Sequence, residues 1–435
     1  MTKFVFLLML LGLMTQPLSA ALDDEVARRA QAIEAQVVAW RRDIHQNPEL
    51  SNREFRTAAL VAEHLRSLGM QVQTEVAHTG VVGILKGGKP GPVVALRADM
   101  DALPVVEKTG LPFASVATGE YEGKQVGIMH ACGHDNHVAI LMGAAVVLTQ
   151  MQNELPGTVK FIFQPAEEGP PKGEDGGAKM MIAEGVLKNP DVDAIFGLHI
   201  GQQGLAGSAS FRARGMMASA QRFDITITGQ QTHGARPWLG VDPVVIGAQI
   251  VNALQTIVSR QIDITQAPAV VTVATFEAGV RNNIVPETAT LSGTIRTFDA
   301  DVRAQIHANI TRIATMIGQS QGASVAVEID PGVPVTYNDP ALTTAMAPTL
   351  RKVFGRDRVY ISARVTGAED FSFFQEQIPG FFFYIGGRPI DVLPENAIPN
   401  HSPFFTADES ALVPGVQVMS QLAVDYLFQQ QAPAN

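Results

Sequence analysis

The first half of the chain alternates short apolar strands with helices, and this pattern constrains its fold more than any other feature. The segments are a helical stretch at 27–68 that ends at Gly69, strands at 92–96, 159–163 and 194–198, and helices at 136–151 and 178–187. Such alternation predicts an α/β fold, with a mostly parallel mixed sheet that carries helices on both faces. In sheets of this kind, ligands bind beyond the carboxyl ends of the strands.

The middle of the chain has a different pattern. Phe223, Ile225 and Ile227 alternate with polar residues, as in a half-buried strand, and Asp242 with Pro243 begins a helix. The segments that follow give the order strand, helix, strand, strand, helix, strand, which is that of a ferredoxin-like α+β sandwich. We therefore expect an inserted domain over about residues 216–330. Its sheet could leave one edge strand free, and edge pairing is one route to a dimer.

The length of the chain also predicts more than one domain. At 435 residues the chain exceeds the usual size of a single hydrophobic core. We expect a catalytic domain in two parts, 22–215 and 331–435, which flank the inserted domain.

The first 21 residues are typical of a secretory signal. Lys3 precedes an apolar run from Phe4 to Met14, and the small residues Ser19, Ala20 and Ala21 follow. The run is shorter than the ~20 apolar residues that span a bilayer. We expect cleavage near Ala20 or Ala21 and a secreted or periplasmic protein. The alternative is an N-terminal anchor or a buried helix.

Charge and hydropathy exclude two classes of partner. The net charge is −10 and the chain contains no run of lysine and arginine, which argues against a nucleic-acid partner. After removal of the signal, no segment indicates a membrane protein. A neutral or small substrate fits this composition better.

The only cysteine stands beside a histidine. Cys132 lies two residues before His134, at the start of the helix predicted at 136–151. Thiolate and imidazole together bind divalent metals well, and cysteine favours zinc over magnesium or calcium, while manganese and cobalt stay open. Coordination would also protect the thiol from oxidation in an exported protein. The alternative is an inert buried cysteine.

Acidic residues and a histidine follow the predicted strands. Asp99, Glu167, Glu168 and His199 all fall at strand ends. Because Glu167 and Glu168 are adjacent, their side chains point in different directions in extended backbone. One could bind a metal while the other accepts a proton from water, the two roles that a metal-dependent hydrolase needs. The alternative for such a pair is a solvated loop.

Two more histidines complete a candidate ligand set. His199 follows an apolar strand, where the alternative is a hydrogen-bonded core residue, and His401 lies in a loop, where the alternative is a solvent-facing turn. Together with the cysteine, the other histidine and a glutamate, they suffice for two metal ions that share ligands.

The inserted domain carries further polar candidates. His233 lies between Thr232 and Gly234 and could donate a hydrogen bond to the oxyanion of a tetrahedral intermediate. Asn283 and Arg296 could hold a substrate carboxylate, Arg296 through its planar guanidinium. The alternative for His233 is a surface turn, and the alternative for Arg296 is a solvated position at a strand end.

In combination these motifs resemble a known family. They include Arg97 to Pro104, His130 to Asp135, Pro165 to Gly169, His233 to Pro237, and Asn400 to Pro403. The resemblance is to secreted bacterial members of the metal-dependent aminoacylase and carboxypeptidase-like amidohydrolases. That group includes hippurate hydrolases and plant indole-acetyl-amino-acid hydrolases.

The resemblance implies a zinc-peptidase-like catalytic domain with two divalent metals per subunit, and an inserted lid domain that forms a homodimer. It implies roles for eight side chains, which are Cys132, His134, Glu168, His199 and His401 as metal ligands, Glu167 as general base, and His233 and Asn283 in the partner subunit's site. Asp99 would support the site. Arg97 stands where the wider family often has a ligand histidine, so we do not expect it to bind metal.

The expected reaction is hydrolysis of the amide bond of N-acyl amino acids, such as hippurate-like or acetyl-amino-acid substrates, by metal-activated water with Glu167 as base. One alternative is a metallo-exopeptidase, either a dipeptidase or a carboxypeptidase. Another is a non-catalytic periplasmic protein whose domains close on a ligand. The sequence does not distinguish zinc, manganese and cobalt as the native metal.

Overall fold

The computed structural model describes residues 21–430, so the predicted signal segment, apart from Ala21, lies outside the described residues. The chain divides into two compact units. Unit 1 contains the chain up to Ala213, Asn338–Ser362 and the segment from Phe373 onward, and unit 2 contains Arg214–Tyr337 and Ala363–Ser372. The segment predicted as an inserted domain, 216–330, falls within unit 2.

Unit 1 is built on an eight-stranded mixed sheet. In order across the sheet, the strands are β1 (Gln71–Val76), β2 (Gly80–Lys86), β6 (Pro156–Gln164), β3 (Lys89–Asp99), β7 (Ala194–Leu205), β18 (Gly380–Arg388), β8 (Ala209–Phe211) and β17 (Val359–Ile361). The four central strands from β6 to β18 run parallel, as the sequence predicts. A separate hairpin consists of β4 (Thr118–Tyr121) and β5 (Lys124–Gly127).

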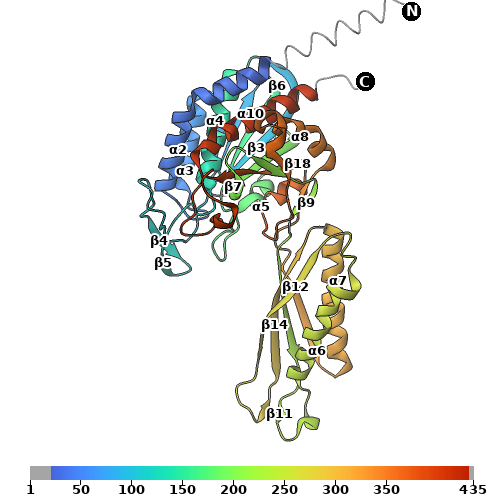
Figure 1. The fold of residues 1–435 in the computed structure, drawn as a ribbon. Coiled ribbons are helices and arrows are strands. Elements are labelled where there is room, and N and C mark those ends of the chain that lie inside the picture. Colours follow the sequence, from blue (N-terminus) through green and yellow to red (C-terminus); the bar gives the residue numbers. More distant parts are fainter. Residues whose placement is uncertain (1–20, 431–435) are drawn as a thin grey trace, which may run out of the picture. The chain divides into compact units, whose positions relative to one another are not determined.

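Helices cover both faces of this sheet (Figure 1). After a helical segment at 21–32, the helices of unit 1 are α2 (Glu34–Gln46), α3 (Phe55–Ser67), α4 (His134–Gln150), α5 (Gly177–Ala183), α8 (Pro340–Phe354) and α10 (Leu412–Gln429). On one face α4 and α10 pack together over alternate strand residues such as Leu96 and Phe161, which belong to the main core. Lys160 points to the other face and donates to the carbonyl oxygens of Val186 and Lys188, beyond α5.

Helix α10 is long and apolar enough to cross a membrane. In the helical span Glu409–Gln429, however, 72% of the most apolar 18-residue stretch is buried inside the structure. It packs against α4 and α8, so it serves as a core helix of unit 1.

Two predictions about secondary structure were wrong. The helical stretch 27–68 is interrupted at Ile33, which precedes α2, and again at Asn47–Glu54, because Pro48 cannot donate the next helical hydrogen bond. Strand β7 continues to Leu205, so His199 lies inside a strand rather than after one. The continuation is stabilised by β18, which pairs with β7 beyond the point where β3 ends.

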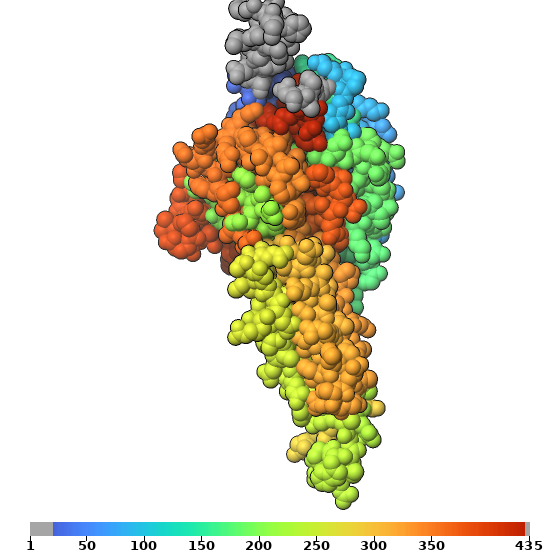
Figure 2. Space-filling view, turned by 90° about the vertical axis from the view of Figure 1, so that its right-hand side faces the viewer, coloured from blue at the N-terminus to red at the C-terminus, as the bar shows by residue number. Residues whose placement is uncertain are grey.

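Unit 2 contains a four-stranded antiparallel sheet in the order β12 (Ala269–Ala278), β14 (Thr288–Thr297), β10 (Gln221–Thr228), β15 (Ser324–Ile329). Helices α6 (Pro243–Thr256) and α7 (Ala300–Ser320) contact each other and lie side by side on the surface of this unit in Figure 2, in yellow and orange. The order of strands and helices along the chain is the ferredoxin-like order that the sequence predicts.

The remaining elements are short. The paired strands are β11 (Thr232–His233) with β13 (Ile284–Val285), and β9 (Arg214–Met217) with β16 (Thr336–Asn338). The short helices and helical turns are η1 (Pro237–Leu239), η2 (Ile257–Gln261), η3 (Arg356–Arg358), α9 (Ser372–Gln375), η4 (Pro394–Asn396) and η5 (Glu409–Ala411).

A buried ion pair ties α2 to the first turn of α4. Arg41 Nε lies 2.8 Å from Asp135 Oδ2, and both side chains are at most 2% exposed. His45 Nδ1 lies 2.8 Å from the same oxygen. Burial would raise the pKa of Asp135, but the positive charges of Arg41 and His45 outweigh it and hold this pKa far below its ordinary value.

Replacing Arg41 with Ala should therefore destabilise unit 1 by about 3 kcal/mol at pH 7, because it leaves a buried carboxylate without its main partner. A lowered folded-state pKa stabilises the protein above the unfolded-state value, and this contribution is lost as the pH falls through the folded-state pKa. The difference between parent and variant should thus shrink below about pH 4. Urea unfolding at several pH values measures it, and an undiminished difference at pH 3 would contradict the account.

Candidate metal centre

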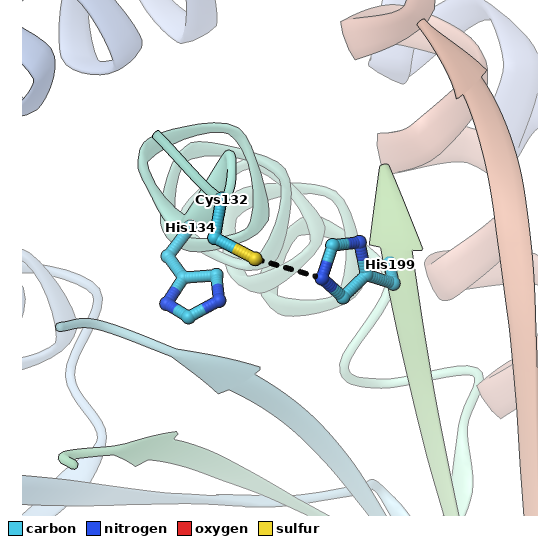
Figure 3. A group of neighbouring side chains, drawn as sticks. All are labelled: Cys132, His134 and His199. Atoms are coloured by element: carbon cyan, nitrogen blue, oxygen red, sulfur yellow. Dashed lines mark hydrogen bonds between the residues drawn. The ribbon is translucent and has the colours of Figure 1, made fainter. Parts of the chain in front are cut away.

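Cys132 and His134 enter the site from the start of α4. Gly133 between them has a φ of +95°, and a Cβ at this position would lie 2.6 Å from Ile200. Only glycine therefore allows the turn that brings both side chains to one side. Cys132 is 6% exposed and His134 is fully buried. Figure 3 shows the sulfur of Cys132 directed at the ring of His199, with the ring of His134 beside it.

His199 comes from β7 and presents one ring nitrogen to the cysteine. Its Nδ1 lies 2.8 Å from the carbonyl oxygen of Ile200, so Nδ1 donates and Nε2 carries a lone pair. That Nε2 lies 3.3 Å from Cys132 Sγ. A backbone contact of this kind fixes the tautomer that a metal-binding histidine needs.

Glu167 and Glu168 lie in a turn after β6. Two buried acidic side chains, Asp101 and Glu54, accept hydrogen bonds from the backbone of this turn. Asp101 accepts from the backbone N–H groups of Glu167 and Glu168, both at 3.1 Å, and Glu54 accepts from that of Ala166 at 2.9 Å. Ala166 has a φ of +52°, an unfavourable conformation for a side-chain-bearing residue. Three consecutive N–H groups thus point at carboxylates, which compensates for the strain of the turn.

Asp101 also orients His134. Its backbone carbonyl oxygen lies 2.8 Å from His134 Nδ1, which leaves His134 Nε2 facing into the site. Its side chain further accepts from Ser51 Oγ at 2.7 Å. One residue therefore sets the positions of the helix ligand and of both glutamates.

His401 reaches the site from the C-terminal part of the chain. Its Nε2 lies 3.3 Å from Cys132 Sγ and 3.0 Å from Glu168 Oε1. The side-chain amide of Asn400 donates to the carbonyl oxygens of Cys132 and Ile200, at 2.7 and 3.1 Å. Asn400 thus fastens this turn to the two elements that carry the cysteine and His199.

The donor atoms have the spacing of metal ligands. Within each of three groups, the ligand atoms lie within 4.8 Å of one another: Cys132, His134 and His199; Cys132, Glu168 and His401; His134, Glu167 and Glu168. For metal bonds of 2.0–2.3 Å, tetrahedral geometry puts donor atoms about 3.5 Å apart. The structure therefore brings together all five predicted ligands and Glu167.

One buried nitrogen provides an independent test of whether a metal fits. His134 Nε2 is inaccessible to water and has no hydrogen-bond partner among the described residues. A buried polar atom without a partner is costly unless something else binds it. The atom lies 3.8 Å from Glu167 Oε2 and faces acceptors rather than donors, so a cation suits this position.

The pKa values of the cluster point the same way. Burial and then the charges of Glu168 and Glu167 raise the pKa of the Cys132 thiol well above its ordinary value. Burial lowers the pKa of His199, while for His134 the charges of Asp99 and Asp101 outweigh burial and raise the pKa to about 10. A bound divalent cation would reverse the shift of the thiol, because it stabilises the thiolate.

Asp99 supports the site from the end of β3. Its Oδ2 lies 2.6 Å from Arg97 Nη1, and its Oδ1 lies 2.5 Å from His137 Nδ1. His137 Nε2 in turn accepts from the backbone N–H of Ile200 at 2.9 Å. Both ring nitrogens of His137 are thus occupied, and Asp99 links β3 to α4 behind the ligands.

The predicted residues of the inserted segment fall into two groups within unit 2. His233 on β11 pairs with Ile284 on β13, and Gly234 N–H donates to the carbonyl oxygen of Asn283 at 2.8 Å, so His233 and Asn283 lie together. Arg296 lies near the opposite end of β14, about 27 Å along the strand at 3.4 Å per residue. The structure does not bring Arg296 to this pair.

Three functional positions were missed by reasoning from the sequence. The side chains of Asp101, Glu54 and Asn400 form hydrogen bonds to backbone groups of the segments that carry the candidate ligands. The spacing of these three residues in the sequence does not indicate such contacts. The sequence did contain a signal for Asp101. This second aspartate lies two residues after Asp99, which itself follows a predicted buried strand.

The chain is similar to known proteins over most of its length. The model of peptidase family M20/M25/M40 matches residues 95–425. Thermostable carboxypeptidase 2 of Saccharolobus solfataricus is 40% identical over 405 residues, which are 93% of this chain and 98% of that protein. N-acetylcysteine deacetylase of Bacillus subtilis is 37% identical over 395 residues, or 91% and 97% of the two chains.

Among solved structures, the Bacillus subtilis YXEP protein is described as a dinuclear metal-binding peptidase from the M20 family. It is 34% identical, has a TM-score of 0.76, and the match covers 92% of this chain and 99% of that one. The likeness supports divalent metals at the cluster and favours a hydrolase over a non-catalytic binding protein. The chain thus belongs to peptidase family M20/M25/M40 and is a metal-dependent hydrolase of amide or peptide bonds.

Proposed function

We propose that the protein hydrolyses the amide bond of N-acyl amino acids and releases a carboxylate and an amino acid. The observation that carries the proposal is the position of Glu167, whose carboxylate lies at the edge of a cluster of five metal-ligand side chains and is 8% exposed. The relative named for deacetylation of N-acetylcysteine supports an acyl-amino-acid substrate.

Five side chains would hold two divalent cations per subunit, namely Cys132, His134, Glu168, His199 and His401. When bound, the cations would lower the pKa of water and polarise the scissile carbonyl. Zinc, manganese and cobalt are the candidates, because a thiolate disfavours magnesium and calcium.

Glu167 would move the proton. Its carboxylate accepts a proton from the attacking water as the water oxygen bonds to the carbonyl carbon, and it then passes that proton to the leaving nitrogen as the C–N bond breaks. The hydrogen bond from its backbone N–H to Asp101 keeps the side chain aimed at the cluster. Asp99 would support the ligands without contacting the substrate.

His233 would stabilise the oxyanion. Its Nδ1 accepts from the backbone N–H of Ala235 at 2.9 Å, so the neutral ring carries its proton on Nε2, which is free to donate. Asn283 beside it would contact the substrate, and Arg296 is retained as a candidate for the substrate carboxylate.

Replacing His233 with Ala should lower kcat by about 10²–10³-fold, because it removes one donor to the developing charge. The metal content should stay at the parent value, since His233 is not among the ligands. Steady-state kinetics together with metal analysis test this, with His307→Ala in the same unit as the control. Parent-like turnover by the His233 variant would remove this residue from the mechanism.

We further propose that the protein is a homodimer through the lid. Strand β12 lies at the edge of its sheet and exposes Val270 (49%) and Phe276 (39%), and near His233 the side chains of Trp238 and Val280 are 75% and 99% exposed. Sedimentation tests the dimer.

If His233 acts in the partner subunit, a mixture of His233→Ala and Glu167→Gln chains should regain activity that neither variant has alone.

The 40% identity to a carboxypeptidase favours an exopeptidase as the second candidate. A panel of N-acyl amino acids and dipeptides, assayed with zinc, manganese and cobalt, separates the two. Faster hydrolysis of dipeptides by every metal form would favour the exopeptidase.

We also propose that the protein is exported and is secreted or periplasmic. The signal-like residues at the start of the chain support export, with cleavage near Ala20 or Ala21. N-terminal sequencing of the mature protein from a cell fraction tests it.

A further inference from the structure

A groove of about 680 Å³ runs along α3 at the outer edge of the unit 1 sheet. Its lining residues come from α3 and the turn before it, from β1 and the turn after it, and from α5. Sites that hold small ligands commonly have volumes of about 300–1,000 Å³. The proposed mechanism uses no residue of this groove.

One face of α3 forms the apolar floor of the groove. Phe55, Ala58 and Ala62 follow one another at intervals of three or four residues, so they share this face, and Arg66 continues it one turn later. The alanine side chains are short, so another chain can approach the helix closely. Phe55 is 64% exposed and offers a large apolar contact at one end.

Strand β1 forms another wall and has a free edge. It is the first strand of the sheet, so no strand pairs with it on the side away from β2. Thr74 and Glu75 line the groove, and the pairing of β1 with β2 skips both residues, where Glu75 has a φ of +61°. An exposed strand edge of this kind can pair with an extended peptide through main-chain hydrogen bonds.

Two charged side chains of the lining are free to bind a ligand. Arg66 and Glu75 are exposed, and neither side chain forms an ion pair or a hydrogen bond with another residue that the structure describes. By contrast, Arg53 is paired with Glu174 at 2.6 Å, and Glu184 accepts from the backbone of the turn after β1 at 2.8 Å. The groove thus offers a free cation and a free anion.

The chain reversal between α3 and β1 sets where these two charges lie. Only residues 68–70 separate the helix from the strand, and the backbone N–H of Met70 donates to the carbonyl oxygen of Leu65 at 3.2 Å. Arg66 therefore lies near the start of β1. Glu75 lies four residues after that start, or about 13 Å at 3.3 Å per residue. An extended tetrapeptide has about this length between its terminal groups.

We propose that this groove binds a short extended peptide of about four residues with apolar side chains, antiparallel to β1. In that direction Arg66 pairs with the C-terminal carboxylate of the peptide and Glu75 with its N-terminal ammonium, while Phe55 contacts its side chains. A strand from within another protein would leave both charges without partners, so a free peptide fits better. The inference does not depend on the proposed function.

Isothermal titration calorimetry on the full-length, zinc-loaded Glu167→Gln protein tests the site, and mass spectrometry checks that the peptide stays intact. The probe is Val-Ala-Val-Ala with free ends, which we expect to bind. The same peptide with an acetylated N-terminus and an amidated C-terminus should bind at least about tenfold more weakly, because it has lost both charges. An analogue methylated at alternate backbone nitrogens should also bind more weakly, because it cannot donate to the edge of β1.

Arg66→Gln and Glu75→Gln, each added to that protein, should weaken binding of the free peptide about fivefold, the loss expected for one exposed ion pair. Arg56→Gln and Glu63→Gln are the matched controls, because both residues are exposed on α3 and neither lines the groove. Both controls should bind the peptide as tightly as the protein without them.

A free tetrapeptide that does not bind at millimolar concentration would overturn the inference. A capped peptide, or free valine, that binds as tightly as the free tetrapeptide would overturn it as well, since the two end charges and the length would then not matter. Unchanged affinity in both the Arg66→Gln and Glu75→Gln proteins would place the peptide elsewhere, for instance at the metal cluster.

Discussion

Glu167→Gln should reduce kcat by about 10²–10⁴-fold, the usual effect of removing a general acid or base. The amide keeps the shape of the side chain but cannot accept a proton from water. The neighbouring ligands are unchanged, so the variant should bind as much metal as the parent. Single-turnover kinetics and metal analysis on the same sample measure both quantities.

Glu154→Gln is the control for this experiment, because Glu154 is an exposed glutamate in the turn after α4. A Glu167→Gln protein that holds its metal and hydrolyses substrate at the parent rate would show that another group accepts the proton. Loss of metal together with activity would instead assign Glu167 a ligand role.

Asp101→Asn should weaken metal binding about 10–100-fold, the typical effect of removing a group that orients ligands. The carboxylate of Asp101 accepts from two backbone N–H groups and from Ser51 Oγ, and its Oδ1 also lies 3.3 Å from His134 Nδ1. Asparagine would set its own N–H₂ group against at least one of these donors. The turn that carries Glu167 and Glu168 should then relax away from the cluster.

Competition with a chelator measures this affinity, and kcat/KM at saturating metal should recover only in part because Glu167 also moves. Asp193→Asn is a matched control, since Asp193 accepts from the backbone N–H of Val93 at 2.7 Å, on β3 but six residues before Asp99. An Asp101→Asn variant with the metal affinity and turnover of the parent would contradict a positioning role. An equal fall in metal affinity and turnover in the Asp101→Asn and Asp193→Asn variants would indicate general destabilisation.

Sequence reasoning predicted the parts of the fold that depend on local patterns. The apolar strands at 92–96, 159–163 and 194–198 became β3, β6 and β7, since buried parallel strands are recognisable as continuous apolar runs. The ferredoxin-like order of unit 2 followed from the alternation of Phe223, Ile225 and Ile227 with polar residues, from the helix that begins at Asp242, and from the order of the segments after it. The candidate metal cluster could be proposed from the sequence because cysteine, histidine and glutamate are specific ligand types and because Glu167 and Glu168 follow a buried strand, although His199 lies inside β7.

Two of the errors have tertiary causes, and one has a local cause. The extension of β7 past His199 depends on pairing with β18, which lies almost 200 residues later in the chain. Asn400 acts through two carbonyl oxygens on distant segments, and nothing in its own neighbourhood indicates those partners. The hydrophobic pattern of 27–68 continued across Pro48, and the break there should have been predicted from the proline itself.

The proposed site depends most on Cys132, which would bind metal together with imidazole and carboxylate ligands. X-ray absorption at the zinc edge of the zinc-loaded protein tests it most directly. The account predicts a sulfur neighbour at about 2.3 Å from zinc, which disappears in Cys132→Ser while nitrogen and oxygen neighbours remain. Zinc surrounded only by nitrogen and oxygen in the parent protein would contradict it.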